Sequence, residues 1–577
     1  MFFRQKIFDN DNKLSIYYHH TGNIPGISKG GEKMKKLKAL IVMCLATAML
    51  VGCGSGTAAS DTYVFSSELD IKNLDSSDAD DGMSFNAMHA CIDGLMGLDE
   101  EGNITEAIAE SYEVSDDQMT YTFHIRDNAN WANGTPVTAN DFVYAWQRIL
   151  KNNGNYAYML GSDGASIKGA DEILAKMGNK TELTDADFAN FGATAKDDKT
   201  LVVELTKPVS YFTELMTFPC YYPINQEFCE EKGDQYAKSA ANVLSNGAFI
   251  MKDWQPGKQA TFEKNEDYWN ADAVKISNLV MNLVQDPQTA ATSFKNGETD
   301  FAPINSELVD QYKNDDSYVS FNEGYLFYLE INEKNTDLAN IKIRQAISKA
   351  IDREDLANNV LKDGSKAAAG FVPRELSVSS EGTDFRDDAG DYDVTKYNLE
   401  EAQKLFAEGL SELGKDSITV RLTYGTDESP MDQMAEYLQN ALTKLNGLNI
   451  EMVATTKQDR IYNKMANGDF DIACTRWGPD YGDPTTYLNL CLDGNANNYG
   501  KYYSEEYENI MSKVRTEANA DTRWQYMIDA EKVIMTDLPD IPVFEKGTSA
   551  LENKKVTGLV HRPVGVPYTF TYVEKAE

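Results

Sequence analysis

One stretch of the sequence reads as a strand, a turn and a helix in direct succession, and this order constrains the fold most. Apolar and polar residues alternate over 121–125, the pattern of a half-buried strand. An Asn-Gly pair at 133–134 predicts a turn. Thr138 and Asp141 have the spacing of a capping box, and apolar residues recur at helical intervals over 139–150. The chain therefore combines strands and helices in short alternation.

The same two periodicities recur along the chain without an internal repeat. Alternation predicts further strands at 201–205, 325–331 and 421–424. Helical spacing predicts further helices at 343–351 and 431–442. This order is typical of an α/β protein with mixed sheets. About 520 residues follow Cys53, which is more than one hydrophobic core usually serves. We therefore expect two or three lobes.

The segment before Cys53 resembles a bacterial lipoprotein signal. Basic residues at 34–38 precede an uncharged apolar run at 39–51, which is short for a membrane span, and small residues lead into the cysteine. The resemblance implies a signal peptide at 34–52, lipid attachment at Cys53, an anchor linker at 53–60 and work outside the cytoplasm. The alternative is an uncleaved anchor helix. Residues 1–33 precede the signal and are interpreted as a non-functional upstream extension.

The charge excludes two classes of partner. The chain has 91 acidic and 54 basic residues, a formal charge of −37. Nucleic acids and anionic lipid surfaces need a basic surface, so neither is expected as a partner. We expect a monomer held at the membrane only by its lipid.

The cysteines leave the disulfide state open. Those that follow Cys53 are Cys91, Cys220, Cys229, Cys474 and Cys491. Cys220 with Cys229 and Cys474 with Cys491 are closest in sequence, but five reduced buried thiols fit equally well. No Cys-x-x-Cys or His-x-x-x-His occurs, so no metal site or other cofactor is predicted.

Residues 121–146 also carry a family resemblance. The text YTFHIRD, Trp131, NGTPVTA and DFVYAW resembles the signature of the peptide-binding class of extracellular solute-binding proteins, the oligopeptide- and dipeptide-binding components of ABC importers. Further matching segments lie at 91–95, 246–249, 263–269, 297–300, 343–353 and 468–471. Their joint order extends the resemblance over nearly all of 61–577.

The resemblance implies an α/β fold of a two-lobed, periplasmic-binding-protein-like clamp, with mixed β-sheets and an extra inserted subdomain. Lobe I would combine 61–98, 226–324 and 541–577, the inserted subdomain would be 99–225, and lobe II would be 325–540. The chain would then cross between the lobes near Gly324-Tyr325 and Pro539-Asp540. A glycine at the first crossing suits a hinge.

The same resemblance points to Asp480 as the acceptor of a peptide's α-ammonium group. An ammonium carries one charge and three donors, so a carboxylate is its natural partner in a closed cleft. Trp477 and Tyr481 flank this acid and could pack against variable peptide side chains. The alternatives are a plain turn in this glycine- and proline-rich segment, and a core role for Trp477.

Other site positions match more loosely. Family members place a basic side chain three residues before the tryptophan to meet the peptide's carboxyl end, but this chain has Cys474 there, and Arg476 is out of register. Asp80 and Tyr328 match site-lining positions, and Asn246-Gly247 could offer backbone groups to an extended peptide. A solvated acidic loop and a packed strand are the alternatives for these.

Three functions follow from these observations. The favoured one is a lipid-anchored receptor that binds short peptides and delivers them to an ABC permease. The second is the same clamp with another ligand, such as a nickel chelate, glutathione, a sugar or a signalling peptide. The third, a secreted hydrolase, has little support because only His89, His124 and His561 follow Cys53 and no triad pattern includes them. We therefore predict that the protein is not an enzyme.

Overall fold

The computed structural model describes residues 61–179 and 183–576, so the predicted signal and Cys53 lie outside the described residues. The largest element is a mixed eleven-stranded sheet. With β13 (Lys366–Ala367) attached beside β17, its strands follow the order β15 (Leu448–Thr455), β14 (Ile418–Gly425), β16 (Ile472–Trp477), β12 (Tyr318–Ile331), β17 (Asp540–Glu552), β11 (Phe301–Ile304), β1 (Thr62–Ser67), β10 (Asn278–Leu283), β9 (Gln259–Lys264) and β8 (Phe249–Gln255).

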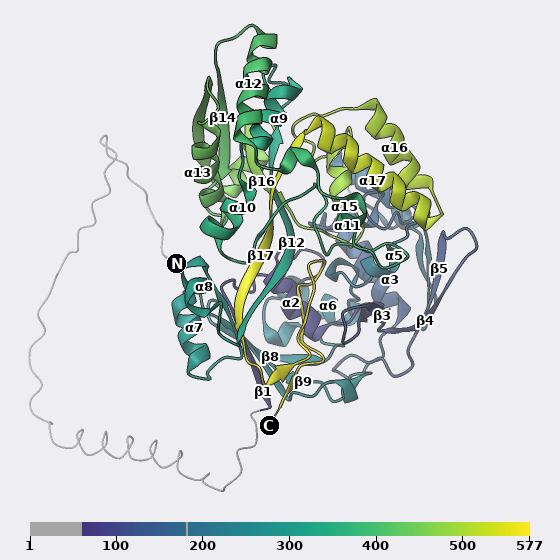
Figure 1. The fold of residues 1–577 in the computed structure, drawn as a ribbon. Helices are drawn as coiled ribbons and strands as arrows, with labels where there is room; N and C mark the ends of the chain where they lie inside the picture. Colours follow the sequence, from purple (N-terminus) through teal and green to yellow (C-terminus); the bar gives the residue numbers. More distant parts are fainter. Residues whose placement is uncertain (1–60, 180–182, 577) are drawn as a thin grey trace, which may run out of the picture. The chain divides into compact units, whose positions relative to one another are not determined.

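Strands β12 and β17 connect the two ends of this sheet. The final part of β17 pairs with β11, whereas residues 326–331 of β12 pair with β16. The two long strands run side by side between the part that holds β14 and the part that holds β1 and β8 (Figure 1). Buried apolar side chains form two main clusters, one drawn mostly from 63–281 and the other mostly from 326–544. This is a two-lobed arrangement with one core in each lobe.

A separate four-stranded antiparallel sheet lies within 109–204. Its strands follow the order β4 (Ala109–Val114), β5 (Thr120–Ile125), β7 (Thr200–Glu204) and β6 (Ala193–Asp197). The adjoining helix α3 (Ala139–Lys151) begins at the predicted capping box, where the Thr138 backbone N–H donates to Asp141 Oδ2 at 2.9 Å. Its apolar face, which includes Trp146, is buried. The predicted strand, turn and helix are confirmed here.

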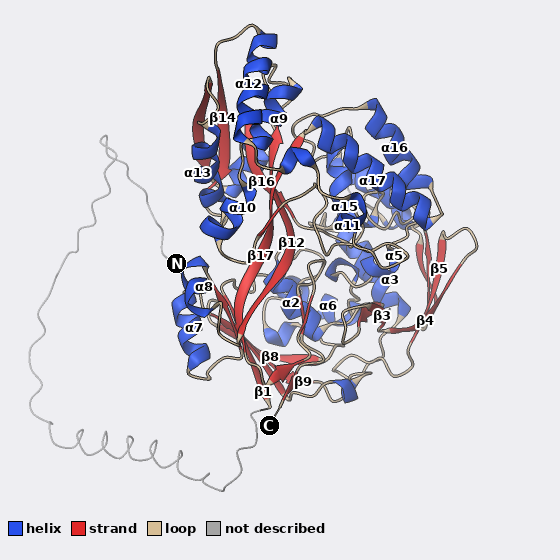
Figure 2. Cartoon of the chain, viewed as in Figure 1, coloured by secondary structure: helices blue, strands red, loops and turns tan. Residues whose placement is uncertain are grey.

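The remaining helices cover the sheets (Figure 2). The predicted helices correspond to α9 (Ile341–Lys349) and α13 (Met431–Leu442). Other helices are α2 (Gly82–Cys91), α4 (Ala170–Gly178), α6 (Gln226–Lys232), α7 (Pro287–Lys295), α8 (Ser306–Tyr312), α12 (Leu399–Leu413), α16 (Glu505–Thr516) and α17 (Ala520–Asp537). None of the helices in the described part of the chain combines the length and the apolar composition of a membrane span.

The five cysteines of the described chain are all reduced and buried. Neither pair that lies close in sequence forms a disulfide. Cys474 belongs to the second apolar cluster, whereas Cys220 belongs to the first. Burial raises the pKa of the Cys474 thiol to about 12, which keeps it protonated. These thiols therefore act as small core residues.

The pairing of β12 with β17 is irregular between Asn322 and Leu326, where the predicted first crossing lies. Gly324 has φ +80°, a conformation that L side chains rarely adopt. A Cβ atom here would lie 1.9 Å from the carbonyl oxygen of Pro563. Both the backbone conformation and the space around it therefore require glycine.

We expect Gly324→Ala to destabilise the protein by about 1–3 kcal/mol, because alanine would be strained at this φ and would displace Pro563. The measurement is thermal unfolding of the variant against the wild type. Gly178→Ala is the matched control, since a Cβ atom at Gly178 meets nothing within 4 Å. Equal melting temperatures for Gly324→Ala and Gly178→Ala would contradict the argument.

Candidate functional site

Asp480 follows β16 by three residues and is held by contacts from a distant part of the chain. The hydroxyl group of Tyr158 donates to Asp480 Oδ2 at 2.9 Å. The backbone N–H of Asp480 donates to Thr486 Oγ1 at 3.2 Å, which fixes the turn. Within the described part of the chain, no Lys, Arg or His forms an ion pair with this carboxylate. Asp480 is therefore an acid whose charge is balanced by no side chain of the described residues.

The surroundings of Asp480 disfavour its ionised form. Burial raises the pKa of Asp480 to about 7, and the hydrogen bond from Tyr158 offsets this only in part. Burial and the nearby Asp480 charge also raise the pKa of Tyr156 and Tyr158 well above the usual tyrosine value. A cation placed beside Asp480 would relieve this desolvation. The group is thus suited to accept a positively charged ligand.

Asp483, three residues after Asp480, has the cationic partner that Asp480 lacks. Arg523 donates to both of its carboxylate oxygens, at 2.6 and 3.0 Å. Burial opposes ionisation, but the Arg523 charge and its hydrogen bonds hold the pKa of Asp483 below the usual value. The negative charge of Asp483 is already paired, so Asp480 remains the better acceptor for a ligand cation.

Trp477 and Tyr481, the predicted aromatic neighbours, lie in different settings. Trp477 is half-buried, packs against the second apolar cluster and has Nε1 3.5 Å from Thr486 Oγ1. Tyr481 is only 3% exposed and stacks on Tyr211 with ring centroids 4.2 Å apart. Tyr481 thus joins the segment after β16 to the first apolar cluster, in which it is buried.

Arg476 lies beside the same turn. Its Nε donates to Glu428 Oε1 at 3.3 Å, and its guanidinium group lies over the Tyr325 ring, 4.7 Å from the centroid. Tyr325 is also close to Gly478, where a Cβ atom would lie 2.4 Å from the ring. Arg476 and Asp480 therefore both lie near the Tyr325 ring. Burial raises the pKa of Tyr325, the Arg476 charge lowers it and the Asp480 charge raises it.

The site residues that the sequence matched more loosely divide into one that lies near Asp480 and three that have no contact with it. Asp80 is exposed, and its charge acts on Tyr156, which places it near Asp480. Tyr328 is 3% exposed and packs edge-on against Phe371. The N–H groups of Asn246 and Gly247 both donate to the carbonyl oxygen of Cys91, at 3.0 and 2.8 Å. None of the contacts recorded for Tyr328 or for Asn246 and Gly247 involves Asp480.

Sequence reasoning missed the residues from elsewhere in the chain that lie near Asp480 or near its neighbour Arg476. They are Tyr156, Tyr158, Tyr325, Glu428 and Lys457. The chain has 31 tyrosines, and no pattern in the sequence distinguishes these three from the others. Glu428 and Lys457 follow two neighbouring strands, β14 and β15, and only this placement could have suggested that they meet.

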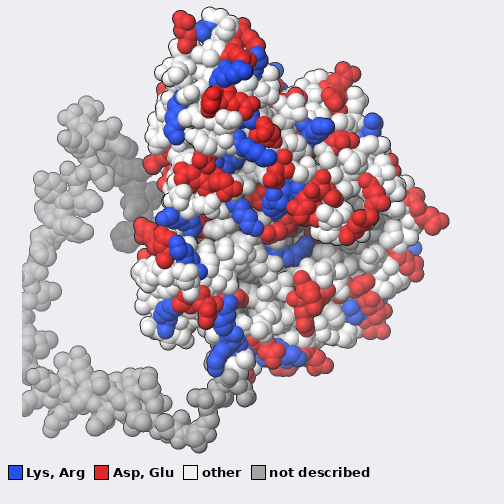
Figure 3. Space-filling model, in the orientation of Figure 1, with Lys and Arg blue, Asp and Glu red and all other residues white. Residues whose placement is uncertain are grey.

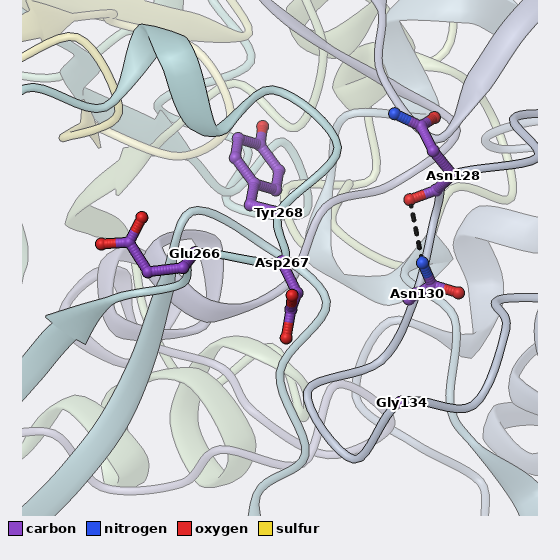
Figure 4. A pocket seen from close by; sticks show the side chains of 6 residues that line it. All are labelled: Asn128, Asn130, Gly134, Glu266, Asp267 and Tyr268. Carbon is purple, nitrogen blue, oxygen red and sulfur yellow. Dashed lines mark hydrogen bonds between the residues drawn. The ribbon is translucent and has the colours of Figure 1, made fainter.

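Two surface hollows lie outside this group. One of about 350 Å³ is lined by Asn128, Asn130, Gly134, Glu266, Asp267 and Tyr268. Its two acidic side chains diverge, and only a hydrogen bond from Asn130 to the Asn128 carbonyl joins the labelled residues (Figure 4). A smaller one of about 110 Å³ includes Lys207, Arg515 and Arg523. Over residues 61–179 and 183–576, no cluster of His, Cys, Asp and Glu could hold a metal ion.

Charged side chains of both signs are interspersed over the face shown in Figure 3, with no broad basic area there. His89 is buried, and its ring nitrogens contact the hydroxyl groups of Tyr222 and Thr569 at 2.7 and 3.0 Å. Burial lowers the pKa of His89 to about 4. This histidine has the contacts of a core residue, not those of a nucleophile's base.

Comparison with known proteins gives one consistent result. Residues 103–499 match the family model described as bacterial extracellular solute-binding proteins, family 5 middle. A dipeptide-binding protein of Lactococcus lactis is 32% identical, over 93% of this chain and 98% of its own length. The dipeptide-binding protein DppE of Bacillus subtilis is 30% identical, over 92% and 98%.

Solved structures agree with these relatives. Peptide-bound OppA of Listeria monocytogenes superposes with a TM-score of 0.73 at 32% identity, covering 90% of this chain and all of that one. The pheromone receptor PrgZ gives a TM-score of 0.74 at 28% identity, with 90% of this chain and all of that chain covered. The similarity therefore extends over both lobes.

Proposed function

We propose that this chain, which belongs to the bacterial extracellular solute-binding proteins of family 5, captures short peptides by their free amino end and delivers them to an ABC permease. Its relatives are named for dipeptide and oligopeptide binding. The observation that carries the proposal is the Asp480 carboxylate, which is desolvated and has no cationic side chain beside it among the described residues. A peptide ammonium supplies the missing charge and the hydrogen-bond donors.

The position of Asp480 supports a clamp. Tyr158 belongs to the predicted inserted subdomain and Asp480 to the predicted lobe II, and their hydrogen bond joins the two. The stack of Tyr211 on Tyr481 joins the same two parts. A ligand held at Asp480 would therefore touch both sides and favour their closure. We propose hinge rotation at the crossings near Gly324 and Asp540, with the lobe boundaries given above.

Membership of an extracellular solute-binding family supports a location outside the cytoplasm and the role of a receptor. We propose that lipid on Cys53 holds it at the membrane and that it acts there as a monomer. A signalling-peptide receptor is a second candidate, because the chain is similar to a pheromone receptor over both lobes. The two roles share the Asp480 site and differ in whether bound peptide is imported, which uptake of radiolabelled peptide by cells would distinguish.

The proposal predicts a bell-shaped pH dependence of peptide affinity. Below the Asp480 pKa of about 7, the carboxyl group is protonated and loses its attraction for the ligand, so affinity should fall roughly tenfold per pH unit. Above about 8, the peptide's α-ammonium loses its proton and affinity should fall again. Calorimetric titration of the full-length protein with trialanine between pH 5 and 9.5 measures both limbs.

Asp480→Asn is the matched control, because asparagine keeps the shape of the side chain and does not titrate. We expect this variant to bind weakly and to lose the acidic limb. Wild-type affinity that stays constant from pH 5 to 7 would overturn the assignment of the ammonium to Asp480.

A further inference from the structure

Two carboxyl side chains face each other in the interior of the predicted lobe II, where β17 begins. Glu330 lies directly opposite Asp540 in the antiparallel pairing of β12 with β17. The next backbone N–H, that of Ile331, donates to the Pro539 carbonyl oxygen at 3.0 Å and fixes this register. Directly opposite side chains leave the same face of a sheet, with Cβ atoms about 4.5–5.5 Å apart. Glu330 is 4% exposed and Asp540 is 8% exposed, so the register holds two buried acids together.

Each of these carboxyl groups has one oxygen that is hydrogen-bonded and one that is not. The Gly500 backbone N–H donates to Glu330 Oε1 at 2.8 Å, and the Cys491 thiol donates to Asp540 Oδ2 at 3.4 Å. Glu330 Oε2 and Asp540 Oδ1 are buried without a hydrogen-bond partner among the described residues. Two ionised groups would leave both oxygens unpaired, which is unfavourable in the interior. One proton on either group would let it donate to the other and would pair both oxygens.

The positive charges near this pair already have other partners. Arg460 acts on Glu330, but its guanidinium group donates to Glu428 Oε2 at 2.7 Å. Nη1 of Arg344 lies 3.7 Å from Oε1 of Glu333, a third carboxylate near the pair. The remaining titratable groups that act on the pair carry no positive charge and are Tyr328, Cys491, Tyr499 and Tyr507. Over residues 61–179 and 183–576, no Lys or Arg forms an ion pair with either member of the pair.

Apolar surroundings disfavour charge on the pair. On its other side, Glu330 is paired with Ala473 of β16, which belongs to an apolar cluster with Met465 and Phe470. Burial raises the pKa of Glu330, and the charge of Asp540 raises it further. Burial also raises the pKa of Asp540. Because the two groups interact this closely, their protons belong to the pair and not to either residue.

We propose that Glu330 and Asp540 share a single proton at neutral pH, and that this proton holds β12 and β17 together in lobe II. Both predicted crossings between the lobes lie on these two strands, so the shared proton makes the connection between the lobes sensitive to alkaline pH. The inference concerns the protein without ligand. It therefore does not depend on the binding of peptides at Asp480.

The direction of the pH effect follows from the two states of the chain. In the unfolded chain both groups ionise above about pH 4, whereas the folded protein keeps the proton. The folded state thus binds more protons than the unfolded state. The stability that the pair contributes is fully present below about pH 4 and is lost as the pH rises through the raised pKa of the folded pair.

Thermal unfolding of the full-length protein without peptide, between pH 6 and pH 9, tests the proposal. Glu330→Gln keeps the shape of the side chain and supplies a neutral amide donor at every pH. The melting temperature of the wild type should fall relative to that of Glu330→Gln by roughly 2–4 °C over this range. Other buried acids, such as Asp480 and Glu545, titrate in both proteins, so the difference between the two profiles isolates the pair.

Glu436→Gln is the matched control, because Glu436 is exposed on α13 and its replacement changes the net charge equally. Its melting temperature should differ from that of the wild type by the same amount at every pH. Asp540→Asn removes the other member of the pair and should reproduce the effect of Glu330→Gln. Parallel profiles for the wild type and either of these two variants would overturn the proposal.

Infrared spectroscopy of the wild type at pH 8 tests the shared proton without any substitution. The carbonyl stretch of a protonated carboxyl group is distinct from the bands of a carboxylate. We expect a band equivalent to about one protonated carboxyl group per molecule, since Asp480 and Glu545, each with a pKa of about 7, are then mostly ionised. The band should persist in Glu436→Gln and disappear in Glu330→Gln. Its absence from the wild type would overturn the proposal even if neither variant of the pair folds.

Discussion

Replacing Asp480 by alanine is expected to weaken the binding of free-amine peptides by about 3–5 kcal/mol, or roughly two to three and a half decades in Kd. The physical reason is that the peptide ammonium would remain desolvated with no carboxylate beside it. In the described structure, the Asp480 side chain accepts one hydrogen bond, from Tyr158. We therefore expect the substitution to lower the free energy of unfolding only slightly. Calorimetry with trialanine at pH 7.5 measures the loss, and thermal unfolding shows that the variant is folded.

Asp493→Ala provides the control for the loss of one acidic charge. Asp493 is exposed and lies with Asp480 in the predicted lobe II. Its side chain forms no hydrogen bond or ion pair in the described structure. Its replacement should change the affinity by less than about 0.5 kcal/mol. Equal losses in Asp480→Ala and Asp493→Ala would mean that net charge, not a specific ion pair, attracts the peptide.

The second large effect concerns stability. Glu531→Ala should reduce the free energy of unfolding by about 3–5 kcal/mol, because it leaves Arg386 buried without a counter-charge. Neither side chain is exposed, and Arg386 Nη1 donates to Glu531 Oε1 at 2.6 Å. The same oxygen accepts the backbone N–H groups of Phe371 and Val372 at 2.9 and 2.8 Å. Alanine would therefore also leave two buried amides unpaired.

Urea unfolding followed by tryptophan fluorescence measures this effect, since Trp524 packs edge-on against Phe385, next to Arg386. Glu531→Gln keeps an oxygen acceptor for the two amides, so its smaller loss isolates the charge. Glu204→Ala is the surface control, because its ion pair with Lys168 is about half exposed and should contribute no more than about 1 kcal/mol. Similar losses for Glu531→Ala and Glu204→Ala would show that burial of the Arg386–Glu531 pair adds no stability beyond that of a surface pair.

The sequence predicted local structure well where one segment supplies its own constraints. The capping box of Thr138 and Asp141 forms within four residues, and the helix at Met431–Leu442 was predicted by periodicity within its own span. The length of β12 was underestimated, because its first half is half-buried and irregularly paired. The pairing of β12 with β17 joins residues more than two hundred positions apart, and no local pattern encodes it.

The site was predictable only in part, for the same reason. Asp480 could be proposed because its segment resembles that of the family, but Tyr158, which donates a hydrogen bond to it, lies 322 positions away in the sequence. Asp480 and Asp483 look equivalent in the sequence, and it is Arg523 that pairs one of them and leaves the other. Lys457 comes near Arg476 only because β14 lies between β15, which Lys457 follows, and β16, which contains Arg476. Charge balance at a site depends on such distant partners.

We propose that Asp480 receives the α-ammonium of a peptide, and a double-mutant cycle with the ligand as one partner separates this role from a purely structural one. Trialanine and N-acetyl-trialanine are titrated into wild type and Asp480→Ala. If Asp480 binds the ammonium, acetylation should weaken binding to the wild type strongly, and Asp480→Ala should weaken trialanine binding by a similar amount. The acetylated peptide should then lose little further affinity in the variant. Equal losses for both peptides on mutation would contradict it, because Asp480 would then only shape the turn after β16.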